Sequence, residues 1–280
     1  MPAATSHNIF ANDLYLKYKN QIEFKELFFL GCQGPDIFFH DFVGITKNSY
    51  LKYGELLHHS KVRDSITFMY NYTKGTILED YFKGYLAHYC LDLRVHPLVN
   101  YYADFLKNNS HLEAHFKVEA AIDVFTLESH GKSIKDFDCY LDIKVEKEKT
   151  DLIGEMYHQL FLSVFDLDLK ASQISRACRL MPFFMYLLKP NTKIKYDLIY
   201  QVEKIAKSHF VSSLMLYQDL PFDISNPKNL NIINPKNKKM QFNYSLAELF
   251  DIASRDFDSF LFKFDKNKIN YDFEGVNLVF

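Results

Sequence analysis

Residues 84–97 read GYLAHYCLDLRVHP and place His88, Asp92 and His96 at intervals of four residues. In an α-helix each step of four residues advances about 40° around the axis, so these three side chains would project from one stripe. Imidazole and carboxylate groups on such stripes build the metal sites of helical bundles. The stretch therefore predicts a helix that carries ligands for a metal ion.

A second stretch repeats this spacing. Residues 111–123, HLEAHFKVEAAID, place His115 and Glu119 four residues apart, with His111 and Asp123 on the same stripe. If the two helices face each other, they bring at least about five nitrogen and oxygen ligands together. Imidazole nitrogen combined with carboxylate oxygen suits zinc best among the common divalent ions, with iron and manganese as alternatives.

Residues that break regular structure are scarce in this chain. Its 280 residues include 9 glycines and 8 prolines, roughly half of what average usage of about 7% and about 5% would give. We therefore predict an all-α fold, a single-domain multi-helix bundle over residues 1–280, with Pro97 ending the helix that carries the first stripe. Two NPK segments predict a long loop at 221–240. The pattern of apolar residues predicts helices in these ranges: 13–29, 50–72, 77–96, 101–107, 112–128, 151–165, 169–188, 196–216 and 245–262.

Charge and hydropathy argue against several broad classes of protein. The formal net charge of −2 disfavours a surface built entirely for nucleic acid, although a local basic groove is compatible with it. The longest apolar run, residues 180–188, is well short of the ~18 needed to span a membrane. The N-terminal residues lack the pattern of a secretory signal. The four cysteines form no C-x-x-C pair and predict reduced, buried thiols in a cytoplasmic protein.

Histidines are concentrated in the first part of the chain, where nine of the eleven lie within residues 1–130. Because histidine is the commonest metal ligand and general base, we expect the site there. Asp36 follows Gly-Pro at a break between helices, where a loop can aim a carboxylate, although an aspartate in a turn is the simpler interpretation. His58 and His59 are neighbours, so on a helix they would point about 100° apart and at most one would face the site.

These motifs follow one another in a specific order. His7 is followed by G-x-x-x-P-D-I, which contains Asp36, and then by GELLH, which ends at His58. GYLAHYCLDLRVHP, H-x-x-x-E-x-x-x-D, NLNIINP and YSLAELFDIA come next. In this order and separation the motifs resemble the zinc-dependent phospholipase C family, whose wider superfamily includes single-strand-specific nucleases. Each motif is weak alone, but the resemblance covers nearly the whole chain.

The resemblance implies an all-α protein that holds three zinc ions at the bottom of a cleft. His59 would then lie behind His58 or at the surface. The implied ligands are Asp36, His58, His88 and Asp92 for the first zinc ion, His96, His115 and Glu119 for the second, and His7 with a bridging Asp92 for the third, together with the terminal amine of Pro2, or of Met1 if that residue is retained.

The resemblance also implies a metal-dependent phosphoester hydrolase, phospholipase C-like, that cleaves a phosphodiester with a zinc-activated water. Two zinc ions about 3.5–4 Å apart would lower the pKa of a water toward ~7 and neutralise charge on the phosphoryl oxygens. Asp36 would orient or deprotonate that water and is the candidate catalytic residue. The expected partner is a phosphodiester-containing small molecule or lipid. Nucleic acid fits the same chemistry, but the charge of the chain does not indicate it.

Two other interpretations are compatible with the sequence. His40 and Asp41 form an HD pair, as in HD-type phosphohydrolases, but that interpretation leaves the two stripes without a role. Alternatively, a non-catalytic helical protein would keep metal as a structural ion and bind a lipid surface or a protein partner. No basic amphipathic helix of the membrane-surface kind is evident in the sequence. Four aromatic side chains are available for such binding or for lining the cleft, although core packing is their simpler role. They are Phe38, Phe39, Tyr85 and Tyr89.

Overall fold

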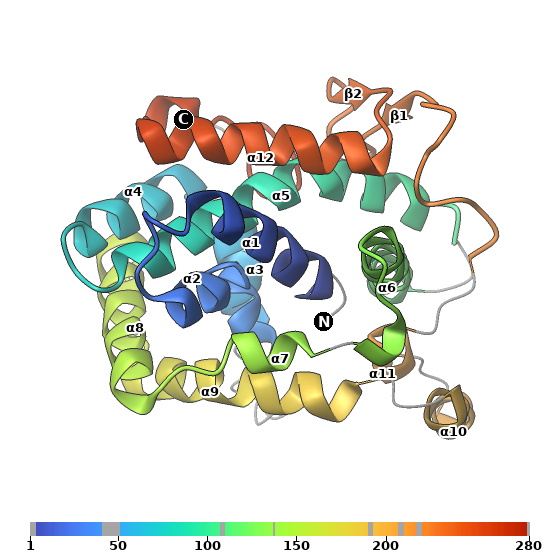
Figure 1. The fold of residues 1–280 in the computed structure, drawn as a ribbon, viewed down its shortest axis with the longest axis horizontal. Coiled ribbons are helices and arrows are strands. Elements are labelled where there is room, and N and C mark those ends of the chain that lie inside the picture. The colour runs from blue at the N-terminus through green and yellow to red at the C-terminus, as the bar shows by residue number, and fades with distance from the viewer. Residues whose placement is uncertain are drawn as a thin grey trace.

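The computed structural model of the 280-residue chain describes residues 4–40, 51–106, 110–136, 138–189, 193–206, 210–216 and 220–278. Most of these residues are helical, and the helices pack around the long helix α5 (Glu79–Ala103) (Figure 1). Among the described residues, paired strands are limited to β1 (Ile232–Ile233) and β2 (Gln241–Phe242), which run antiparallel. The prediction of an all-α fold is confirmed.

Helix α5 is buried on almost all sides because other helices surround it. A helix in such a position is usually apolar all round, yet the buried residues of α5 include His88, Asp92 and His96. Burying ionisable groups costs free energy unless partners or metal ions compensate. The helices that pack most closely against it are α2 (Lys25–Gly31), α12 (Leu246–Phe262) and α6 (His111–Ser129).

Two glycines bring α2 and α5 close together. A Cβ atom at Gly84 would overlap the carbonyl oxygen of Phe28, and one at Gly31 would overlap the carbonyl oxygen of Tyr81. The two helices therefore meet backbone to backbone, which the absence of a side chain at both positions permits. This contact fixes the C-terminal end of α2 beside the helix that carries the first stripe.

The prediction that Pro97 ends this helix is wrong. Helix α5 continues to Ala103 with Pro97 inside it. A proline in a helix interior removes one hydrogen bond and costs about 3 kcal/mol or more. Tertiary packing supplies most of the stability of helices in proteins, and Pro97 itself and its neighbours Leu98 and Val99 are buried. We attribute the continuation of the helix to this packing.

Helix α1 (Ala4–Tyr18) begins well before the helix predicted at 13–29, and the predicted range is divided between α1 and α2. The first turns of α1 are buried. Asp123 of α6 accepts hydrogen bonds there from the backbone N (2.8 Å) and the Oγ (2.6 Å) of Ser6, and so satisfies amide groups that lack partners within the helix. The buried face includes the polar Thr5, Ser6 and His7, so apolar periodicity gave no signal for this start.

The other helices follow the predicted ranges with shifted ends. The range 50–72 is divided between α3 (Leu51–His59) and α4 (Val62–Thr73), and Lys61 between them has a φ of 49°. The described part of 196–216 includes residues of α10 (Lys193–Ala206) and α11 (Phe210–Ser213). Residues 101–103 of the predicted helix 101–107 are the end of α5, residues 104–106 are not helical, and the predicted loop 221–240 contains β1. These helical elements are η1 (Gly34–His40), α3 (Leu51–His59), α4 (Val62–Thr73), η3 (Ile134–Asp136), α7 (Cys139–Asp142), α8 (Lys147–Leu160) with its π-helical end η4 (Phe161–Phe165), α9 (Ala171–Leu188), α10 (Lys193–Ala206), α11 (Phe210–Ser213) and η5 (Lys266–Lys268).

The four cysteines pack in the interior as free thiols, as the sequence predicts: Cys32, Cys90, Cys139 and Cys178. Burial raises the pKa of the Cys178 thiol to about 12. Because the thiolate is the reactive form, these side chains serve packing rather than chemistry. Nowhere in the described residues is there a helix with the length and apolar character needed to cross a membrane.

Candidate metal centre

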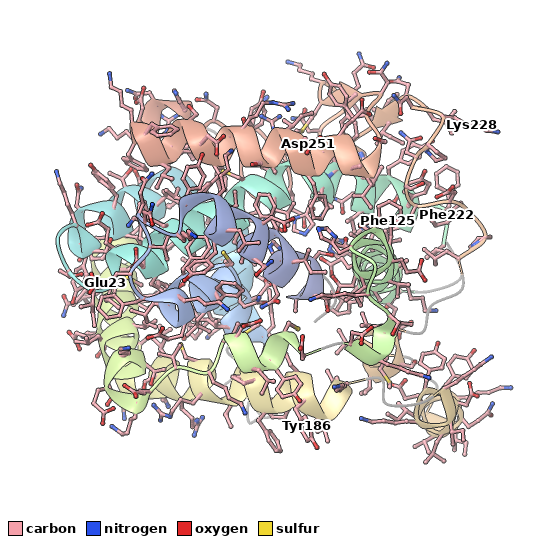
Figure 2. The ribbon with its side chains drawn as sticks, viewed as in Figure 1. Glu23, Phe125, Tyr186, Phe222, Lys228 and Asp251 are labelled. Carbon is pink, nitrogen blue, oxygen red and sulfur yellow. The ribbon has the colours of Figure 1, made fainter. Side chains whose placement is uncertain are left out.

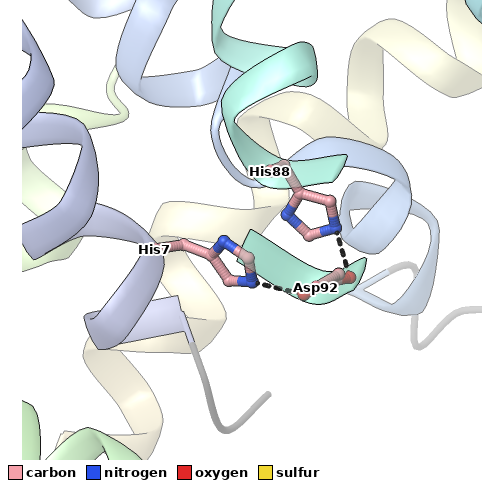
Figure 3. A group of neighbouring side chains, drawn as sticks. All are labelled: His7, His88 and Asp92. Carbon is pink, nitrogen blue, oxygen red and sulfur yellow. Dashed lines mark ion pairs between the residues drawn. The ribbon is translucent and has the colours of Figure 1, made fainter. Parts of the chain in front are cut away.

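Asp92 of α5 lies among histidine side chains from α1, from α3 and from α5 itself. Its Oδ1 atom is 3.0 Å from Nε2 of His7 on α1, and its Oδ2 atom is 3.0 Å from Nε2 of His88, one turn earlier on α5 (Figure 3). Nε2 of His58 on α3 is 3.8 Å from the same Oδ2 atom. The two oxygens of one buried carboxylate thus face different groups of imidazoles.

Three groups of described side chains could hold a metal ion, because their ligand atoms lie within 4.8 Å of one another. Asp92 belongs to one group and has an oxygen close to two members of another. The remaining group lies between α5 and α6. The groups consist of His7, His88 and Asp92, of Asp36, His58 and His88, and of His96, His115 and Glu119.

Asp36 comes from the short helix η1, which follows the end of α2. Its Oδ1 atom lies 3.3 Å from Nε2 of His58. Gly34 precedes it with a φ of +54°, and a Cβ atom there would overlap the ring of His88. Glycine therefore allows the turn both its left-handed backbone and its close approach to the histidine. The carboxylate of Asp36 therefore lies beside His58, on the segment that follows α2.

Three of the histidines are oriented in the same way. In each ring Nδ1 lies within hydrogen-bond distance of a backbone carbonyl oxygen, which only accepts, so Nδ1 carries the hydrogen. The Nε2 atom is then the one that points into the cluster. Metal-binding histidines are commonly oriented by such bonds. The pairs are His58 with Gly54 (2.8 Å), His88 with Cys32 (3.0 Å) and His96 with Phe273 (3.0 Å).

The group between α5 and α6 combines His115 and Glu119 of the second predicted stripe with His96 of the first. Oε1 of Glu119 lies 3.3 Å from Nε2 of His96 and 3.2 Å from Nε2 of His115. Burial opposes ionisation of Glu119, but the nearby His115 and His96 outweigh it and lower the pKa of the carboxyl to about 2. A carboxylate that is charged at neutral pH and two imidazoles form a donor set typical of zinc.

The contact between His88 and Asp92 tests whether a metal ion fits. His88 is fully buried, and its Nε2 atom has no hydrogen-bond partner. With the ring hydrogen on Nδ1, a lone pair of Nε2 faces a carboxylate oxygen 3.0 Å away. The ring of His7 stacks on that of His88 at 4.1 Å, so protonating both rings would bring like charges together. A cation between nitrogen and oxygen satisfies both lone pairs, and the residues present therefore fit a metal ion.

A cavity of about 240 Å³ gives access to the candidate ligands. Phe39, Leu112 and Phe116 form an apolar part of its wall, and Lys236 contributes a positive charge. The candidate ligands that line it are Asp36, His58, His96, His115 and Glu119.

Glu274 also lines this cavity, although none of the sequence motifs includes it. It is buried, its Oε2 atom lies 2.9 Å from Nζ of Lys236, and it accepts a hydrogen bond from Asn100. Burial opposes ionisation, but the charges of His96, His115 and Lys236 hold the pKa of Glu274 below its ordinary value. The available signal was Asp-x-Glu-Gly at 272–275, because an aspartate followed by a glycine marks a turn.

The structure separates the neighbours His58 and His59. His58 faces the cluster, whereas Nδ1 of His59 lies 3.2 Å from Asp272 and its Nε2 atom 3.5 Å from Glu55. The hydrogen bonds to Asp272 and Glu55 raise the pKa of His59 to about 9. His59 thus holds the turn at Asp272, next to the carbonyl of Phe273 that orients His96.

The other candidate residues have different places. His111 lines the cavity but belongs to none of the three groups, and Asp123 holds the start of α1 instead. Phe39 lines the cavity. The residues Met1, Pro2 and Asp41 and the side chain of His40 lie outside the described residues, so the third ligand set is incomplete and the HD pair is untested. Of the four candidate aromatic side chains, the other three, Phe38, Tyr85 and Tyr89, are buried in the core.

Comparison of the chain with protein-family models, with curated proteins and with solved structures finds no match. The findings define the class of protein as a helical protein with three buried groups of histidine and carboxylate side chains that could bind metal ions.

Proposed function

We propose that this chain is a zinc-dependent phosphodiester hydrolase of the phospholipase C-like kind. The pairing of His88 Nε2 with Asp92 Oδ2, two electron-rich atoms 3.0 Å apart in a buried site, carries the proposal. The order of the sequence motifs supports it, because the eight side chains that the resemblance to the zinc-dependent phospholipase C family assigns as ligands are those of the three groups.

The proposed ligands form three sets, two of which share Asp92. Imidazole nitrogens and carboxylate oxygens are usual zinc ligands, and both kinds are present in each set. When bound, neighbouring zinc ions would polarise phosphoryl oxygens and lower the pKa of a water toward ~7. The sets are Asp36, His58, His88 and Asp92, then His96, His115 and Glu119, and finally His7 with the second oxygen of Asp92.

Asp36 is the proposed catalytic residue. Its carboxylate is buried and lines the cavity beside His58. From this position it orients an attacking water and accepts its proton as a general base. Lys236 attracts the anionic phosphodiester, and Phe39 and Phe116 offer an apolar wall to its organic part.

Two measurements on untagged protein test the proposal: zinc content by mass spectrometry, and hydrolysis of the phosphodiester bis(p-nitrophenyl) phosphate. We expect bound zinc and measurable hydrolysis. Asp36→Asn should lower the rate at least about 100-fold, because it removes a general base. The matched control is Asp64→Asn, an exposed aspartate on α4, which should leave the rate unchanged.

Two results would contradict the proposal in different ways. If the protein binds no zinc after reconstitution at neutral pH, the three groups only pack in the interior and are not metal sites. Protein that binds zinc but cleaves no phosphodiester would indicate structural ions in a non-catalytic helical protein.

A further inference from the structure

Helix α10 presents an apolar stripe to solvent. Its residues Ile194, Leu198, Val202 and Ile205, here called the α10 stripe, recur at the spacing of one helical face. All four are exposed, with Ile194 at 77% and Ile205 at 86%. Exposed apolar residues that stand singly are ordinary, whereas a continuous stripe indicates a binding surface. The expectation that the chain has no basic amphipathic helix is wrong at α10.

The opposite face of α10 is the one that packs on the protein. Glu203 is buried and accepts hydrogen bonds from the backbone N of Val211 (2.5 Å) and of Ser212 (2.8 Å). Successive residues on a helix are about 100° apart, which places Glu203 roughly opposite the α10 stripe. The helix is therefore fixed with its most apolar face turned outward, at the edge of the molecule (Figure 1).

Lysines flank the α10 stripe. On the helical wheel Lys193 and Lys204 lie on one side together with Asp197, the one exposed acidic residue of α10, and Lys195 lies on the other side with its ammonium group bound to backbone carbonyls. Glu203 is turned inward, so the exposed lysines of α10 outnumber its exposed carboxylates. Lysine stems extend along apolar surface while their ammonium groups reach toward anions. An apolar stripe between lysines complements a negatively charged lipid surface.

The end of α9 extends this surface. Lys195 donates hydrogen bonds to the carbonyl oxygens of Leu187 and Lys189, which ties the two helices together. Phe183, Tyr186 and Leu187 are exposed there, and Tyr186 lies on the same lower edge of the molecule as α10 (Figure 2). Aromatic side chains of this kind favour the level of lipid headgroups.

We propose that the α10 stripe docks the protein on an anionic lipid bilayer. With 14 residues, α10 is about 21 Å long, shorter than the ~30 Å hydrocarbon core, so it lies in the interface rather than across it. A symmetric dimer through the stripe would bring lysine borders together. Lysine is depleted in protein interfaces, and the stripe has no aromatic or arginine anchor of the kind they use.

The test is sedimentation with vesicles of phosphatidylcholine, with and without phosphatidylglycerol. We expect wild-type protein to sediment with the anionic vesicles, less so at high salt. The double variant Leu198→Gln, Val202→Gln should bind them at least about tenfold less, because it removes two apolar anchors. The matched control is Leu16→Gln, Leu152→Gln, which changes exposed leucines of α1 and α8 and should bind like wild type.

A fluorescence measurement does not depend on how the double variant folds. The chain contains no tryptophan, so Leu198→Trp supplies a single reporter whose emission should shift to the blue on anionic vesicles. Leu16→Trp should show no shift. Absence of wild-type sedimentation, equal binding by the two double variants, or a dimer that Leu198→Gln dissociates without any vesicle binding would each overturn the proposal. The proposal does not rest on phosphodiester hydrolysis, because no residue of α10 lines the cavity of the candidate metal centre.

Discussion

The Nε2 atom of His88 and the Oδ2 atom of Asp92 lie 3.0 Å apart on successive turns of one helix. The Nδ1 atom of the same ring is bound to the carbonyl of Cys32, so the ring cannot turn its hydrogen toward the carboxylate without losing that bond. Two acceptors that face each other in a buried position repel unless a cation lies between them. The free energy of metal binding is therefore linked to the stability of this helix.

Replacing Asp92 by asparagine should separate metal binding from folding. We expect Asp92→Asn to lose at least one zinc ion per chain, measured by mass spectrometry, because the carboxylate serves two of the ligand sets. Without metal, the asparagine amide can donate to Nε2 of His88. The free energy of unfolding of the metal-free variant should then be about 1 kcal/mol higher than that of metal-free wild type, because the variant gains one hydrogen bond.

The control for that comparison is Asp251→Asn, at an exposed position on α12, which should retain the zinc of wild type. Equal zinc content in Asp92→Asn and wild type would exclude Asp92 as a ligand.

The group between α5 and α6 should lose its metal separately. His115→Gln removes a nitrogen that lies 3.2 Å from Glu119, and we expect it to lower the zinc content by about one ion, as expected for a site with three protein ligands. His111→Gln is a close control, because His111 lies one turn earlier and lines the same cavity outside the group. A similar loss of zinc from both variants would point to a general disturbance of α6 instead.

Gly84→Ala should destabilise the fold. Its methyl group would overlap the carbonyl of Phe28 on α2, and overpacking of this kind costs about 1–3 kcal/mol in the free energy of unfolding. Denaturation by urea measures this cost. Gly54→Ala is the comparison, because the nearest atoms there belong to the ring of Phe39, a side chain that can move. A greater loss of stability in Gly54→Ala would contradict the backbone contact.

Asp123 should make stability fall as the pH rises. Burial raises the pKa of Asp123 to about 7 from its ordinary 3.8, against the hydrogen bonds from Ser6 that lower it. Between pH 3.8 and about pH 7 the folded state holds a proton that the unfolded state has released. The free energy of unfolding therefore falls as the pH rises through this range, and the stabilisation by the protonated carboxyl is complete only below pH 3.8. The loss is on the order of 4 kcal/mol across the whole window.

Unfolding by urea at several pH values within this window measures the slope. Asp123→Asn should remove it, so that the variant gains stability relative to wild type as the pH rises. If the free energy of unfolding of wild type instead rises relative to that of the variant as the pH increases, Asp123 is ionised and holds the start of α1 as a charged cap.

Local patterns predicted the two stripes because four-residue spacing is a property of the helix itself. His88, Asp92 and Glu119 needed only this periodicity and the resemblance to be found. The start of α1 could not be predicted in that way, because its buried polar face is satisfied by Asp123, far away in the sequence. Glu274 was missed for a similar reason. It lies in irregular chain, and its place in the cavity depends on tertiary contacts with Lys236 and other side chains.

The bond between His96 and the carbonyl of Phe273 joins residues that are 177 positions apart. On the ribosome, the histidine emerges long before the carbonyl that orients it. The ligand group between α5 and α6 therefore reaches its final geometry only after residue 273 has left the exit tunnel. Metal loading of that group is expected to be a late event in biosynthesis, and a nascent chain that already displays His96, His115 and Glu119 would hold zinc only loosely.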